Sequence, residues 1–91
     1  MEAYFDRFSI TMTKRQAESV SHMGQCDADV NILLTIPAIK RQLKKISDSD
    51  LIAELKETGA WSTKELQDRQ ANEQRIIWIA GGNIIDELYS R

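Results

Sequence analysis

His22 and Cys26 are the residues best suited to chemistry: they are the only histidine and the only cysteine, four positions apart. Asp27 and Asp29 follow closely, so the group holds donors that a metal ion or a thiol-based reaction could use. The spacing argues against both, because Gly24 is expected to end the helix between them, and no second histidine or cysteine completes a zinc site. We therefore predict no metal and no cofactor, and we interpret this turn as structural, with a polar contact surface as the alternative.

Enzyme motifs are missing from the sequence as a whole. It contains no glycine-rich phosphate loop, no nucleophile elbow and no His/Glu metal motif. With a single histidine and a single cysteine, general acid–base catalysis has few candidate groups. The sequence predicts that the protein is not an enzyme.

Four basic residues form a cluster within six positions of one predicted helix. Its members are Lys40, Arg41, Lys44 and Lys45. The cluster could contact a phosphate backbone, and the helix that follows suggests a helix-turn-helix. That following helix, however, carries Asp50, Glu54 and Glu57 against one lysine, and the net charge of the chain is −2. We favour a solvated face and keep nucleic-acid binding as an alternative.

The last predicted helix changes character halfway along its length. Between Gln67 and Arg75 only Ala71 is apolar, whereas residues 76–80 are apolar on every side. A helix that is polar all round either bridges solvent, or offers hydrogen-bonding side chains to a partner or to an internal network. We expect its polar half to be exposed in the isolated molecule and covered only by another macromolecule.

The predicted partner-binding surface combines this polar half-helix with the turn that follows the first helix. It consists of His22, Gln25, Asp27, Trp61, Asp68, Asn72 and Arg75. Trp61 is explained by packing at a helix start, although tryptophan is also a frequent interface anchor. Trp78 lies in the apolar half and is predicted to belong to the core.

Length and composition predict one globular domain. The chain has 91 residues, of which 42% are apolar and 29% are charged. One cysteine cannot form an internal disulfide, and the first residues do not resemble a signal peptide. The longest uncharged runs are about half of the ~20 residues that a membrane span requires. These features predict a cytoplasmic protein without a membrane span.

Residues 1–12 are predicted to form an extended arm. Phe8, Ile10 and Met12 alternate with polar residues, which is the period of a half-buried strand. No later segment resembles a partner for this strand. The arm is therefore expected either to pack across the helices or to pair with another molecule.

Capping signals divide residues 13–91 into helices. The predicted helices cover about residues 13–22, 27–35, 37–46, 48–58 and 63–90. Unbroken, the last would be ~42 Å long, whereas a compact chain of this size has a radius of gyration of about 12 Å. We favour one helix bent at Gly81 and Gly82 over two helices with Asn83 as the second cap. The predicted fold is all-α: a compact bundle of five or six helices with an extended N-terminal arm.

Three motifs carry a resemblance to a protein type. They read SHxGQCDxDV from Ser21, ELKxxGAW from Glu54 and RIxWIA from Arg75. With these motifs, residues 13–85, about four fifths of the chain, resemble a recurrent type of small bacteriophage and prophage protein. The resemblance implies no catalytic residue. It implies a phage gene product that acts inside a bacterial cell, and small phage proteins often bind and inhibit host proteins.

These inferences together predict an accessory phage or prophage protein. Its expected partner is a bacterial host protein or an anti-phage defence protein, which it binds and inhibits. The alternatives are a nucleic-acid-associated phage regulator and a structural phage protein that assembles with copies of itself.

Overall fold

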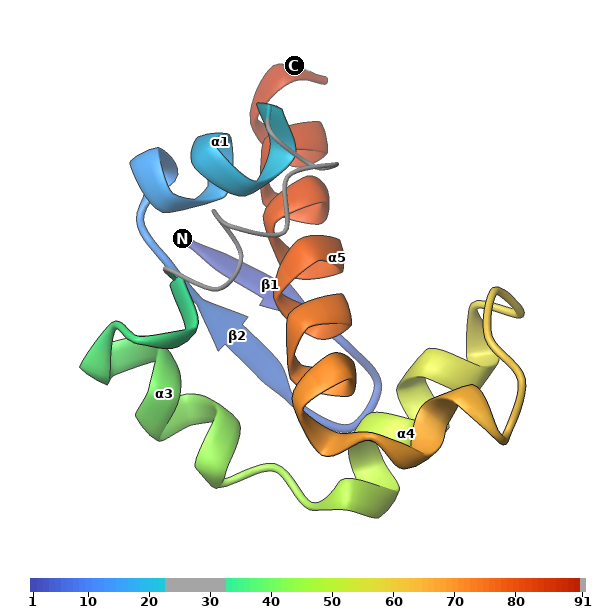
Figure 1. The fold of residues 1–91 in the computed structure, drawn as a ribbon. Helices are drawn as coiled ribbons and strands as arrows, with labels where there is room; N and C mark the ends of the chain where they lie inside the picture. Colours follow the sequence, from blue (N-terminus) through green and yellow to red (C-terminus); the bar gives the residue numbers. More distant parts are fainter. Residues whose placement is uncertain (23–32, 91) are drawn as a thin grey trace.

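The computed structural model describes residues 1–22 and 33–90 (Figure 1). Its elements are β1 (Glu2–Tyr4), β2 (Ser9–Thr11), α1 (Lys14–His22), α3 (Pro37–Lys44), α4 (Asp48–Glu57), the 3-10 turn η1 (Glu65–Gln67) and α5 (Arg69–Tyr89). The prediction of an all-α bundle with five or six helices is wrong, because these residues form four α-helices and a small antiparallel sheet. Most of the helix predicted at 27–35 lies outside the described residues.

The N-terminal arm is a β-hairpin in which β1 pairs antiparallel with β2. The partner of the predicted strand therefore precedes it in the chain, and Ala3 lies opposite Ile10. A strand of three residues is too short to show a two-residue period, so the pattern that indicates β2 does not indicate β1. Ala3 and Ile10 are both buried, which places one face of the hairpin against the core.

The outer edge of β2 is closed by a side chain of α3. The Gln42 amide accepts a hydrogen bond from the Thr11 N–H at 2.7 Å and donates one to the Thr11 carbonyl at 2.8 Å. A neighbouring strand would otherwise bind these two backbone groups. Gln42 thus occupies the place of a third strand on this side of the hairpin.

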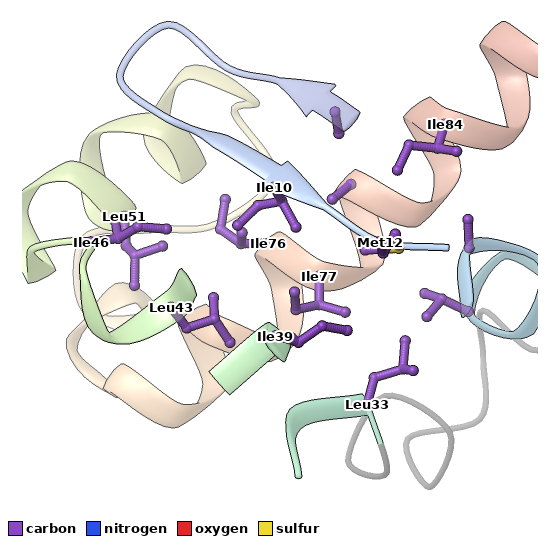
Figure 2. Close-up of a cluster of buried hydrophobic side chains, with 14 of the residues drawn as sticks. Ile10, Met12, Leu33, Ile39, Leu43, Ile46, Leu51, Ile76, Ile77 and Ile84 are labelled. Atoms are coloured by element: carbon purple, nitrogen blue, oxygen red, sulfur yellow. The ribbon is translucent and has the colours of Figure 1, made fainter. Parts of the chain in front are cut away.

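One hydrophobic core lies between the hairpin and the helices, and Figure 2 shows side chains from β2, α3, α4 and α5 meeting there. The large, fully buried side chains are Ile10, Val20, Ile39, Leu43, Leu51, Leu55, Leu66, Ile76 and Ile77. The apolar stripe predicted for the third helix is confirmed, because Ile39, Leu43 and Ile46 are all buried. None of the helices among residues 1–22 and 33–90 is both long and apolar enough to cross a membrane.

Local capping signals are confirmed at several helix ends. Thr13 and Gln16 form a reciprocal capping box, with hydrogen bonds of 2.9 and 3.1 Å. Ser47 accepts from the Asp50 N–H at 3.1 Å at the start of α4. Gly59 has a φ of +74°, the left-handed conformation that ends a helix without the penalty of a Cβ.

The long helix begins six residues later than the sequence predicts. Ser62 and Glu65 do form the predicted capping box, with hydrogen bonds of 3.0 and 3.3 Å, but the box opens only the short turn η1. Asp68 then adopts an extended backbone, and its carboxylate accepts from the Gln70 N–H at 3.0 Å. The Asp68 N-cap starts a new helix, so the helical turn that begins after the Ser62 N-cap does not continue into α5.

α5 continues through Gly81 and Gly82 to Tyr89, so the alternative of a separate final helix capped by Asn83 is wrong. Its 21 residues span about 31 Å at 1.5 Å per residue. The longest dimension of the molecule is 34 Å. The late start at Arg69, rather than a break at the glycines, allows the helix to fit.

Glu65 provides a prediction about pH. The backbone N–H of Ser62 holds the pKa of Glu65 below its ordinary value of 4.5, and the Ser62 hydroxyl adds to the effect. A pKa lowered by folding means that the charged carboxylate stabilises the fold above the unfolded pKa, and this contribution is lost as pH falls through the folded pKa.

We therefore expect Glu65→Gln to be less stable than the wild type near neutral pH, with a difference that shrinks below pH 4.5. Urea denaturation of both proteins over a series of pH values measures this difference. A difference that stays constant across the series would show that the carboxylate charge contributes nothing.

Candidate functional site

Trp78 is at the surface, with 43% of the residue exposed, and the prediction that it belongs to the core is wrong. Ile76, Ile77 and Ala80 are fully buried, so they define the side of α5 that faces the core. Successive residues of a helix are turned by 100°, which places Trp78 away from that side. A stretch that is apolar on every side contains no pattern to tell which of its residues faces outward.

Arg75 lies one helical turn before Trp78 and is held in place by several contacts. Its guanidinium lies 5.0 Å from the centre of the Trp61 ring, and it donates to the Glu65 carbonyl and to the Asn72 side-chain oxygen, both at 3.1 Å. Residues three apart are neighbours on a helix surface. Trp78 is therefore the neighbour of Arg75 on the surface of α5, and we name Trp61, Arg75 and Trp78 together the tryptophan–arginine surface.

Asn72 belongs to the interior, which corrects its place in the predicted partner-binding surface. It is 2% exposed, and its amide nitrogen donates to the Leu66 carbonyl at 2.8 Å. Its oxygen accepts from Arg75 at 3.1 Å. Asn72 is therefore not available to a partner. Instead it positions Arg75 by accepting a hydrogen bond from its guanidinium.

Arg69 also points inward, toward the turn between α3 and α4. Its guanidinium donates to the Leu43 and Ile46 carbonyls at 2.6 and 2.8 Å, and it pairs with the carboxylates of Asp48 and Glu73. The polar stretch from Gln67 to Arg75 is therefore divided between internal bonds and solvent. Its exposed members are Gln67 and Asp68, which precede α5, and Gln70 within it. Asp68 is the N-cap of α5.

Of the other predicted contact residues, Trp61 belongs to this surface, whereas three lie where the structure describes no side chain. Trp61 is half-buried and packs against the core. His22 closes α1, but its side chain, together with Gln25 and Asp27, falls outside the described part of the chain. The interpretation of the turn between His22 and Cys26 as structural, with a polar contact surface as the alternative, therefore stays a prediction.

The basic cluster is exposed on and after α3, as expected of a solvated face. Its four members, Lys40, Arg41, Lys44 and Lys45, take part in no ion pair with another described residue. Their exposure is compatible with a solvated face and with an anionic partner. Nucleic-acid binding through this cluster stays the alternative hypothesis.

Two acidic residues of α4, Glu54 and Glu57, are bound by Arg7 from the hairpin loop. Its guanidinium pairs with Glu54 at 3.3 Å and with Glu57 at 2.9 Å, and its backbone N–H donates to Glu54 at 2.8 Å. The hydrogen bond from Arg7 lowers the pKa of Glu57. Asp6 lies close enough to these carboxylates for the three to bind a cation, but Arg7 already supplies a positive charge there.

Comparisons with protein-family models, with curated proteins and with solved structures find no match for this chain. The resemblance to small phage and prophage proteins therefore stays a prediction.

Proposed function

We propose that this protein acts by binding another protein through the tryptophan–arginine surface. The observation that carries the proposal is the exposure of Trp78 one helical turn from Arg75. Tryptophan and arginine dominate the binding energy of protein interfaces more than other residue types do. An aromatic ring of this size is normally buried, so its exposure needs a reason beyond folding.

The surface is already ordered in the free protein, which favours binding. Arg75 is fixed by the Trp61 ring and by two hydrogen bonds, so it would lose little conformational freedom in a complex. Gly82 lies one turn beyond Trp78 on the same side of α5, and the space where its Cβ would be is open. A partner can therefore approach the Trp78 ring closely along the helix.

The partner class in this proposal is a bacterial host or anti-phage defence protein, which the protein binds and inhibits in the cytoplasm. Support for that class comes from the resemblance to phage and prophage proteins. Support for a binding role comes from the surface itself, whose residues offer apolar area and a fixed cation.

Trp78→Ala is expected to weaken binding to such a partner by about thirtyfold, because truncating an interface hot spot costs about 2 kcal/mol or more. The partner is first captured from bacterial lysate with the full chain and identified by mass spectrometry. Titration calorimetry with the purified partner then measures the affinity of both proteins.

Tyr89→Ala is the matched control, because Tyr89 is another exposed aromatic residue of α5, with 64% exposure, three turns away. It is expected to leave the affinity unchanged. Unaltered binding by Trp78→Ala, or equal losses in both variants, would remove the tryptophan–arginine surface from consideration.

A further inference from the structure

The two edges of the hairpin differ, because the edge of β2 is closed by Gln42 and the edge of β1 is open. Met1 and Met12 exchange two backbone hydrogen bonds, of 2.9 and 2.8 Å. In an antiparallel ladder, such pairs alternate with pairs whose N–H and C=O groups point outward. With Ala3 opposite Ile10, the outward groups of β1 belong to Glu2 and Tyr4.

No hydrogen bond from the described part of the chain reaches the outward groups of Glu2 and Tyr4. With respect to residues 1–22 and 33–90, two donors and two acceptors are therefore left on this edge. An exposed strand edge is a template for pairing with a further strand. The Tyr4 side chain, 74% exposed, stands beside it.

A groove of about 290 Å³ adjoins this edge. It is lined by Met1, Glu2, Tyr4, Ile84, Glu87 and Leu88. Among the described elements, α5 packs against β1 whereas α3 packs against β2, and Figure 1 shows β1 beside α5. The groove thus lies between the open edge and the C-terminal half of α5, and it presents apolar side chains to a strand added there.

We propose that β1 pairs antiparallel with β1 of a second copy of this chain, about a twofold axis that passes beside Ala3. Glu2 then lies opposite Tyr4 of the partner subunit, and Tyr4 lies opposite Glu2 of the partner subunit. Each of these two pairs exchanges an N–H···O=C bond in both directions, so all four outward groups of each copy are satisfied. The two hairpins become one four-stranded sheet.

The edge is self-complementary, which favours a second copy: Glu2 and Tyr4 lie symmetrically about Ala3, so a twofold axis there places each opposite the other. Each Glu2 lies opposite a tyrosine, so no like charges are directly opposed. A two-stranded hairpin is marginal by itself, and four strands covered by helices are a more stable sheet. This inference does not depend on the tryptophan–arginine surface.

Sedimentation equilibrium of the full chain tests the proposal over a range of concentrations. We expect a monomer–dimer equilibrium with a dissociation constant of the order of 10 µM, because the interface is small. Tyr4→Pro removes an outward N–H and leaves the β1–β2 bonds in place, so it is expected to be monomeric at every concentration. Ser9→Pro is the matched control: Ser9 lies opposite Tyr4 on the other edge, and this variant should still dimerise.

Charge substitutions test the register separately. Tyr4→Glu places a glutamate opposite Glu2 in both pairs and is expected to weaken the dimer at least tenfold. Adding Glu2→Lys to this variant should restore the dimer, because each lysine then lies opposite a glutamate. Circular dichroism confirms that each variant remains folded. A wild-type chain that is monomeric at millimolar concentration, or a dimer insensitive to Tyr4→Pro, would overturn the proposal. Trp78→Ala should leave the dimer intact, which distinguishes this test from that of the proposed function.

Discussion

Arg69→Ala is expected to lower the free energy of unfolding by about 3 kcal/mol. The guanidinium binds the Leu43 carbonyl near the end of α3 at 2.6 Å, and the Ile46 carbonyl in the following turn at 2.8 Å. Both carbonyls would lose a charged donor, and Glu73 would lose its ion-pair partner. Arg69 also connects the start of α5 to Asp48 at the start of α4, so three helices are held by one side chain.

Urea denaturation measures this effect as a shift of the midpoint at an unchanged slope. Arg69→Lys is expected to recover only part of the loss, because an ammonium group cannot reproduce the fork that binds several oxygens at once. Arg41→Ala, on the exposed side of α3, is the control and should change stability by less than about 0.5 kcal/mol. A loss below about 1 kcal/mol for Arg69→Ala would mean that these bonds hardly contribute.

Gly81→Leu is expected to destabilise the protein by about 2 to 3 kcal/mol, in spite of the higher helix propensity of leucine. A Cβ at Gly81 would lie 3.0 Å from the Cβ of Val20 and 3.5 Å from the Ala17 carbonyl oxygen. Val20 is fully buried and its Cβ cannot turn aside, so α1 would have to move away from α5. The glycine is needed because two helix backbones approach closely at this point.

Gly82→Leu is the matched control, since the neighbouring position has nothing within 4 Å of its Cβ. It should be neutral or stabilise the protein by up to about 1 kcal/mol, as replacement of glycine within a helix usually does. Thermal and urea denaturation of both variants measure the difference. Equal effects at the two positions would contradict the close packing of α1 against α5.

Several features of the candidate site were beyond prediction from the sequence. Asn72 and Gln70 are both polar residues in a polar stretch, but one is buried and the other is exposed. The difference in their burial depends on the Leu66 carbonyl in η1, which accepts a hydrogen bond from the Asn72 side chain. Trp78 and Ile77 are adjacent apolar residues that project from different sides of α5. Which of the two is buried depends on the side of α5 against which the core packs.

The sequence by itself determined where α1, α3 and α4 begin, because each start is set by groups within four residues of one another. Thr13 with Gln16, Pro37, and Ser47 with Asp50 act in this way. Only the tertiary structure decided that residues 2–4 pair with 9–11, which side of α5 is buried, and that Arg69 binds the turn after α3. Those outcomes depend on groups that are far apart in the sequence and come into contact only when the whole chain packs. The spacing of neighbouring residues therefore does not predict them.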